Sequence, residues 1–154
     1  MNVETITLAT KPQFIDICML IHSQSELQHL PISRDKVDLL ADRCMYNTQW
    51  FGRVAVDDGA VVGAMCGYVQ PLIYSDVMLG VEEGIYVMPH AVNRGKIAKS
   101  LLLEFVAWCR GHGVADIRTG VISNIDNLAA DVLYRYNGFK RIGTIYALKE
   151  PGGV

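Results

Sequence analysis

The residues best suited to bind a ligand lie between Glu82 and Gly113, where a predicted strand passes through a basic turn into a predicted helix. Arg94, Gly95 and Lys96 form this turn, and Lys99 follows it. The first N–H groups of a helix have no partner within the helix, and its N-terminal end carries a partial positive charge. Cations placed there oppose the helix dipole unless an anion neutralises them. The turn therefore indicates an anionic, phosphate-like ligand.

Composition limits the class of protein that carries this turn. The chain has 154 residues, 51% of them hydrophobic, and a formal net charge of −2, which favours one domain over residues 1–154 and gives no sign of nucleic-acid binding or electrostatic attachment to a membrane. The four cysteines are widely spaced without a C-x-x-C pair, so we expect reduced thiols and no metal site. Neither a signal peptide nor a membrane span is evident, which predicts a cytoplasmic protein.

The N-terminal half is expected to supply one strand, two helices and a hairpin. Asp57-Asp58-Gly59 is a strong hairpin turn between two β-branched runs. Ser33 is placed to cap the second helix, and Trp50 is assigned to the core. The predicted segments are a strand at Val3–Ala9, helices at 10–25 and 34–47, and paired strands at Phe51–Val56 and Ala60–Val69.

The C-terminal half alternates strands and helices. A strand–helix–strand crossover of this length makes the strands on either side of the basic turn parallel. The predicted segments are strands at Val77–Val87 and Val114–Ile122, helices at Ala98–Arg110 and Asp126–Tyr136, and one bent strand or a hairpin at Phe139–Leu148. The fold class is therefore α/β (α+β), with a mixed, mostly antiparallel sheet of six to seven strands and helices on both faces.

Two motifs allow a family to be suggested. From Asn127 the sequence reads N-L-A-A-D-V-L-Y-R-Y-N-G-F, and Val87-Met88-Pro89 precedes the basic turn and the pair Leu101-Leu102. These stretches resemble the N-x-x-A-x-x-L-Y-x-x-x-G-F and V-x-P…Q/R-x-x-G-x-G/A motifs of the GNAT superfamily, the acyl-CoA-dependent N-acetyltransferases. The order of predicted elements is similar to that family's order over essentially the whole chain.

The first motif departs from the family pattern. Asn93 stands where the family has Arg or Gln, Lys96 stands where it has Gly, and one extra residue follows Pro89. Ala98 takes the last small position. These departures leave two functions open: an N-acetyltransferase that moves an acetyl group from acetyl-CoA directly to an amine, or a binding or regulatory protein that keeps the fold with a weakened coenzyme A site.

The resemblance implies how acetyl-CoA is held. The fourth and fifth strands are expected to splay around the pantetheine arm, and N–H groups from Gly95 to Lys99 are expected to meet the pyrophosphate. The resemblance does not identify the amine acceptor, and it does not decide whether the protein is a homodimer. The loops at 23–32 and 70–76 are expected to line the acceptor side. The predicted cofactor-binding residues are Tyr86, Val87, Pro89, Asn93, Arg94, Gly95, Lys96, Ile97, Ala98, Lys99, Asn127 and Tyr134.

The resemblance also implies catalytic roles. Tyr134 would protonate the departing thiolate, and the Val87 N–H would meet the oxyanion. The family's strand carboxylate falls on Gly84 here, so Glu82 and Glu83 are the candidate bases. Because strand side chains alternate, we expect Glu82 on the face of Gly84 and Glu83 on the opposite face, and we favour Glu82 slightly.

Structural interpretations compete with these roles. The competing interpretation of Tyr134 is a residue that packs on an amphipathic helix with its hydroxyl in water, and the motif favours the catalytic role. Asn127 is equally a cap of the fourth helix. Glu82 and Glu83 are equally solvated charges of a strand edge.

Overall fold

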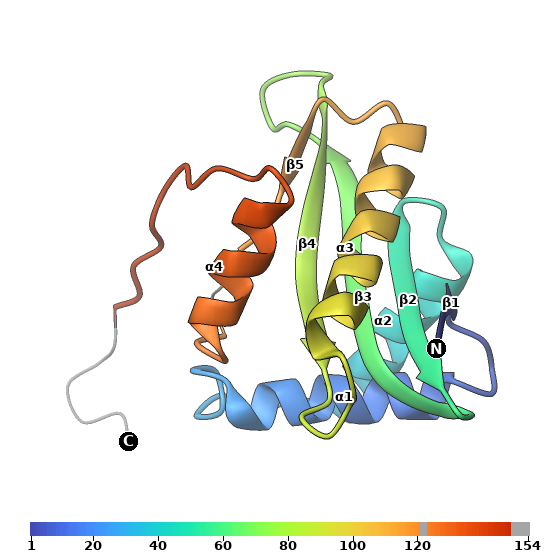
Figure 1. Ribbon diagram of the computed structural model, residues 1–154. Coiled ribbons are helices and arrows are strands. Elements are labelled where there is room, and N and C mark those ends of the chain that lie inside the picture. Colours follow the sequence, from blue (N-terminus) through green and yellow to red (C-terminus); the bar gives the residue numbers. More distant parts are fainter. Residues whose placement is uncertain (121–122, 149–154) are drawn as a thin grey trace.

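The computed structural model describes residues 1–120 and 123–148, and its centre is a sheet with the strand order β1-β2-β3-β4-β5 (Figure 1). Neighbouring strands from β1 to β4 are antiparallel, whereas β5 is parallel to β4. The parallel pair predicted from the crossover length is therefore confirmed. The strands are β1 (Asn2–Thr5), β2 (Trp50–Asp57), β3 (Ala60–Pro71), β4 (Met78–Val87) and β5 (Asp116–Arg118).

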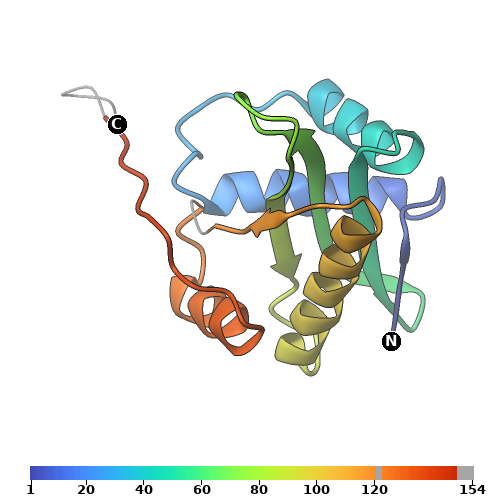
Figure 2. The ribbon, with the colours of Figure 1, turned by 90° about the horizontal axis from the view of Figure 1, so that it is seen from above.

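Helices cover both faces of this sheet. Two of them, α1 and α2, lie against one face, and α3 and α4 lie on the other (Figure 2). Each face has its own buried cluster, one around Phe14 and Ala41 and one around Phe51 and Phe105. The helices are α1 (Lys11–Gln24), α2 (Arg34–Tyr46), α3 (Arg94–Gly111) and α4 (Asn127–Tyr136).

The prediction of six or seven strands is wrong for the described residues, which form a sheet of five. Residues 139–148 form no strand, and most of this segment extends away from the sheet (Figure 1). Phe139 packs against Tyr134, whereas the large apolar side chains from Ile142 onward lie in solvent, with Tyr146 90% and Leu148 96% exposed. A β-branched pattern predicts extended backbone but cannot supply a partner strand, and here none of the described strands pairs with it. Val121 and Ile122 of the predicted fifth strand lie outside the described residues.

The first strand is shorter than the predicted Val3–Ala9. After Thr5 the backbone turns, because the Thr7 N–H donates to the Thr10 hydroxyl at 2.9 Å and the Lys11 N–H donates to the Thr7 carbonyl at 2.8 Å. Threonine side chains that bond to nearby backbone compete with strand pairing in this way. The hairpin turn is confirmed, with positive φ at Asp58 and Gly59.

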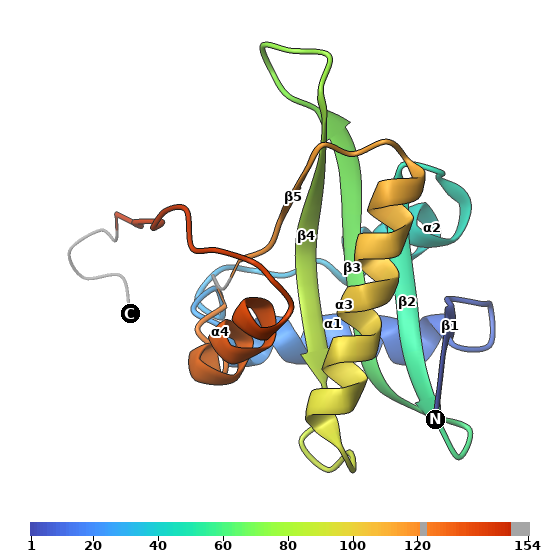
Figure 3. The same ribbon diagram turned by 45° about the horizontal axis from the view of Figure 1, so that its top comes forward.

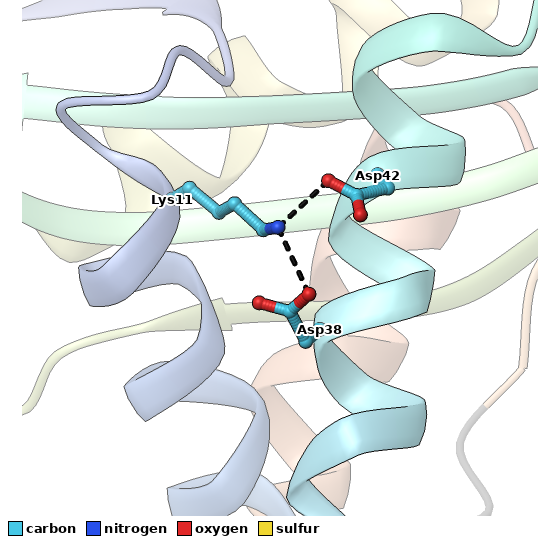
Figure 4. A network of polar contacts seen from close by, with 3 residues as sticks. All are labelled: Lys11, Asp38 and Asp42. Atoms are coloured by element: carbon cyan, nitrogen blue, oxygen red, sulfur yellow. Dashed lines mark hydrogen bonds and ion pairs between the residues drawn. The ribbon is translucent and has the colours of Figure 1, made fainter.

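A cation holds the first two helices together. Lys11 of α1 donates to Asp38 at 3.0 Å and to Asp42 at 2.7 Å, both on α2 (Figure 4). The two aspartates raise the pKa of Lys11, so the ammonium stays charged. This contact fixes α2 against α1 and therefore positions the α2 residues that face the sheet.

Candidate active site

The two parallel strands stay together over only three residues. Leu79, Gly80 and Val81 pair with Asp116, Ile117 and Arg118, and beyond this point the two segments diverge (Figure 3). The outer edge of β4 from Glu82 to Val87 therefore has no paired strand among the described residues. The candidate site is built along this edge.

A β-bulge lies at the point of divergence. Gly84 pairs with Cys66 and Glu82 pairs with Gly67, so Glu83 is an extra residue of β4 without an opposite partner on β3. Gly67 is needed there, since a Cβ on it would lie 2.6 Å from the Val81 carbonyl oxygen and 2.7 Å from the Phe105 ring.

The bulge sends the two neighbouring glutamates to opposite faces of the sheet. Glu82 points to the α4 side, where its Oε2 accepts a 2.7 Å hydrogen bond from the Tyr134 hydroxyl. Glu83 shares a cavity with Gly84 on the α1 and α2 side. Strict alternation, which placed Glu82 on the face of Gly84, is therefore wrong at this point of β4, because the extra residue resets the alternation.

Burial changes the protonation of the Glu82–Tyr134 pair. Desolvation raises the pKa of Glu82 to about 7, and the neighbouring charge of Glu83 adds to this, while hydrogen bonds from Tyr134 and the Gly120 backbone act in the opposite direction. Tyr134 is buried, and its burial together with the Glu82 charge raises the pKa of the phenol. At neutral pH the pair combines a carboxylate that exchanges protons readily with a phenol that keeps its proton.

The backbone of β4 adds a hydrogen-bond donor to this edge. The Met88 N–H donates to the Val62 carbonyl at 2.8 Å, and Gly63 lies opposite Val87. In an antiparallel ladder this pattern makes the N–H groups of the Gly63–Val87 pair point away from each other. The Val87 N–H therefore points to the outer edge of β4.

The basic turn lies at the end of the same strand, and α3 begins there at Arg94, four residues before the predicted start. Asn93 precedes the helix in the left-handed conformation, with φ 60° and ψ 40°, which asparagine tolerates better than most residues. Its carbonyl accepts from the Lys96 and Ile97 N–H groups. The predicted set of donors from Gly95 to Lys99 is therefore too far along the helix, and Arg94 and Gly95 supply the first N–H groups.

The start of α4 lies next to the start of α3. Asp126 is the residue that caps α4, since it accepts from the Ala129 N–H, and the predicted cap at Asn127 is wrong. The Asn127 amide instead donates to Asn124. Arg94 lies 3.7 Å from the Asp126 carboxylate and links the two helix N-termini.

A larger cavity opens on the opposite face of the sheet, with a volume of about 540 Å³. Trp50 and Tyr68 form one wall, with ring centroids 4.9 Å apart, and Arg43 lies over the Trp50 ring at 5.6 Å. Glu83 lines this cavity and also a smaller apolar one of about 120 Å³ beside it. The larger cavity, called here the Trp50–Glu83 cavity, is lined by Leu40, Arg43, Gln49, Trp50, Tyr68, Val69, Gln70 and Glu83.

Most of this cavity could not be predicted from the sequence. Trp50 was expected in the core, yet it is only partly buried and lines the cavity. Of the two loops expected to line the acceptor side, only the segment beginning at Gln70 contributes a lining residue. The sequence carried no signal for the pairing of Trp50 with Tyr68, because it depends on a register shift between Ala55 and Val56. Among residues 1–120 and 123–148, no group of His, Cys, Asp or Glu residues is arranged to hold a metal ion, and none of the helices could cross a membrane.

One protein-family model matches this chain. The model of the acetyltransferase (GNAT) family matches residues 17–139, which include the bulge, the basic turn and Tyr134. No relative among curated proteins is detectable from the sequence.

Solved structures with the same fold are numerous and distant in sequence. An aminoglycoside 6'-N-acetyltransferase from Acinetobacter haemolyticus superposes with a TM-score of 0.70 at 18% identity, covering 98% of this chain and 99% of its own. A ribosomal-protein-alanine N-acetyltransferase from Brucella melitensis gives 0.69 at 15% identity, covering 97% and 99%. The aminoglycoside N-acetyltransferase AAC(6')-Iy, solved with CoA, gives 0.72 at 16% identity, covering 97% and 95%. At these identities the likeness establishes the fold.

Proposed function

The chain belongs to the GNAT acetyltransferase family, and we propose that it transfers an acetyl group from acetyl-CoA directly to an amine. The observation that carries this proposal is the 2.7 Å hydrogen bond between Tyr134 and Glu82 at the point where β4 and β5 diverge. A phenol that keeps its proton and a carboxylate with a pKa of about 7 are the acid and the base that acetyl transfer to an amine requires.

The start of α3 fits the phosphates of coenzyme A. Gly95 leaves room for a ligand, because no heavy atom lies within 4 Å of the position where its Cβ would be. Lys96 and Lys99 are exposed beside the first N–H groups of the helix. Backbone donors, a helix dipole and cations at one point are the usual means of holding a phosphate. The neighbour solved with CoA supports the same ligand class.

Acetyl-CoA would supply an activated thioester carbonyl, and the protein would supply the proton transfers. An acceptor that arrives as an ammonium first releases one proton to water, and Glu82 accepts a second proton as the neutral amine forms the new C–N bond. The Val87 N–H donates to the carbonyl oxygen as negative charge develops on it. Tyr134 gives its proton to the sulfur as the C–S bond breaks, and it recovers a proton from Glu82 through their hydrogen bond. The proton lost by the amine therefore ends on the thiol.

Calorimetric titration with acetyl-CoA, followed by a thiol-release assay with a panel of amines, tests the proposal. We expect binding and amine-dependent release of coenzyme A. Absence of binding at millimolar acetyl-CoA would refute the transferase and favour the alternative, a regulatory protein with a weakened site. That alternative draws on Arg94, which is already paired with Asp126, and on Lys96 in place of glycine. The cytoplasmic location and a homodimer stay predictions of the sequence.

A further inference from the structure

We propose that the Trp50–Glu83 cavity binds the acceptor, and that the acceptor is a zwitterionic aromatic amine, an amino acid with a free carboxylate. This inference rests on the proposed acetyl transfer and adds the chemical class of its acceptor. Two opposite charges and an aromatic wall within one cavity carry it.

Arg43 and Glu83, the two charged residues of the cavity, form no ion pair with each other. Arg43 and Glu83 both line it and both are exposed, yet neither forms a salt bridge in the part of the chain that the structure describes. A ligand with an ammonium group at Glu83 and a carboxylate at Arg43 would neutralise both. The guanidinium of Arg43 suits a carboxylate because it offers two parallel N–H donors.

The aromatic wall selects a ligand with a flat apolar group. Trp50 and Tyr68 are neighbours across the hairpin, and their rings are tilted by 39° to each other. Both side chains are only partly buried, so ring surface remains available to a ligand. Leu40 and Val69 extend the apolar surface. An aromatic side chain would pack there, while the polar ends of the same molecule meet the two charges.

The same lining disfavours a polycationic acceptor. Glu83 is the one carboxylate among the lining residues, and Arg43 would repel additional ammonium groups. An amino acid carries one ammonium and one carboxylate, which matches this pair in number and in sign.

Glu83 is the residue that joins the cavity to the unpaired edge of β4. Glu83 lines the Trp50–Glu83 cavity, and both Glu83 and Gly84 line the smaller cavity beside it. Gly84 has no side chain, and no heavy atom lies within 4 Å of where its Cβ would be. Glu82 precedes Glu83 in β4 and lies on the opposite face of the sheet. An amine held at Glu83 would therefore reach Glu82 and Tyr134 across the edge of β4 that has no paired strand among the described residues.

The kinetic test compares L-phenylalanine with 2-phenylethylamine, which lacks only the carboxylate. The wild-type protein should acetylate L-phenylalanine with a kcat/KM about tenfold higher than the amine. Arg43→Gln should remove this preference by lowering kcat/KM for the amino acid alone. Arg34→Gln is the matched control, since Arg34 lies on the same helix but pairs with Asp16 at 3.0 Å. It should keep the preference.

A binding test does not depend on catalysis. Trp50 lies at the cavity, whereas Trp108 packs in the core against Phe51 and Phe105. Titration of the protein with L-phenylalanine should change the tryptophan fluorescence, and Trp50→Phe should abolish the change. Glu83→Gln should weaken binding of both ligands about tenfold.

The outcomes separate this inference from the proposed function. Amine acetylation in which 2-phenylethylamine or the aminoglycoside kanamycin exceeds L-phenylalanine would overturn the inference and leave the transferase intact. Fluorescence titration of L-phenylalanine without acetyl-CoA binding would refute the transferase while supporting the cavity. An unchanged preference in Arg43→Gln would also overturn the inference, because Arg43 is the proposed carboxylate partner.

Discussion

Glu82 and Glu83 are adjacent in the sequence and have the same chemistry, yet the fold gives them different surroundings. Glu82 is bonded to Tyr134 on the α4 side, and burial raises its pKa to about 7. Glu83 is exposed at a cavity on the α2 side, beside Trp50 and Tyr68. The difference arises from one extra residue in β4, since without the bulge the neighbouring positions would keep simple alternation.

Under the proposed function, one strand would serve two ligands. The α4 side carries the groups suited to proton transfer, whereas the α2 side carries groups suited to recognition. A carboxylate that must accept a proton benefits from burial, and a carboxylate that must hold an ammonium group benefits from staying ionised. The bulge allows two consecutive residues, Glu82 and Glu83, to take these two roles. Variants on one side should therefore change the other side little, apart from the loss of the Glu83 charge, which contributes to the raised pKa of Glu82.

The largest effect is expected on the α4 side, from Tyr134→Phe. The change removes the proposed acid and should lower kcat about 100-fold or more with little change in acceptor KM. Steady-state thiol release measures this. Tyr136→Phe is the control, since Tyr136 lies on the same helix and is 87% exposed. An unchanged kcat in Tyr134→Phe would remove Tyr134 as the acid.

The second prediction distinguishes the two glutamates by pH. Below pH 4.5 Glu82 is protonated in both the folded and the unfolded chain. Between pH 4.5 and about 7, Glu82 is protonated in the folded chain and ionised in the unfolded chain. Because the folded chain binds the extra proton, the free energy of unfolding falls as pH rises through this range. The shift corresponds to about 3 kcal/mol of unfolding free energy. Urea unfolding between pH 4.5 and 8 should show this loss in the wild-type protein.

Glu82→Gln should remove that pH-dependent loss, whereas Glu83→Gln should retain most of it. The acid limb of kcat/KM should follow the same carboxylate, with activity rising as pH increases through about 7. If the two variants show the same pH dependence of stability, the contrast between the glutamates is wrong.

The third prediction removes the bulge itself. Gly67→Ala places a Cβ against the Val81 carbonyl and the Phe105 ring and should lower the unfolding free energy by about 1–3 kcal/mol. Gly84 lies on β4 next to the extra residue Glu83, and no heavy atom is within 4 Å of where its Cβ would be, so Gly84→Ala should cost less than about 0.5 kcal/mol. Urea unfolding compares them. Equal losses would show that close packing under the bulge does not maintain it.

The sequence was sufficient for features that depend on local chemistry. The Asp58-Gly59 turn predicted the hairpin, and the crossover length predicted that β5 is parallel to β4. The order of helices followed from apolar periodicity. By contrast, residues 139–148 have a strand-like pattern but no paired strand, because a partner is a property of the whole fold.

The site was harder to predict because bulges change register. Counting back from the hairpin turn without a bulge places Gly67 opposite Trp50, but the shift between Ala55 and Val56 places Tyr68 there instead. The pairing of Trp50 with Tyr68 could therefore not be predicted, because it depends on a register shift of one residue. The second bulge, beside Glu83, reversed the expected faces of the two glutamates in the same way. Both shifts depend on contacts between distant segments, which local periodicity does not contain.

The smallest predicted effect tests whether weakening the contact between α1 and α2 changes the acceptor cavity without changing acetyl-CoA binding. Lys11→Met removes the contacts to Asp38 and Asp42 that hold α2 against α1, and α2 carries Arg43 and Leu40 of the cavity. We expect the melting temperature to fall by about 2 °C and the acceptor KM to rise about twofold. Arg34→Met breaks a more exposed pair between the same helices and should change both quantities less.

Acetyl-CoA affinity should stay constant in both variants, because α3 and α4 lie on the other face of the sheet (Figure 2). A weaker acetyl-CoA affinity in Lys11→Met would mean that the two faces are coupled.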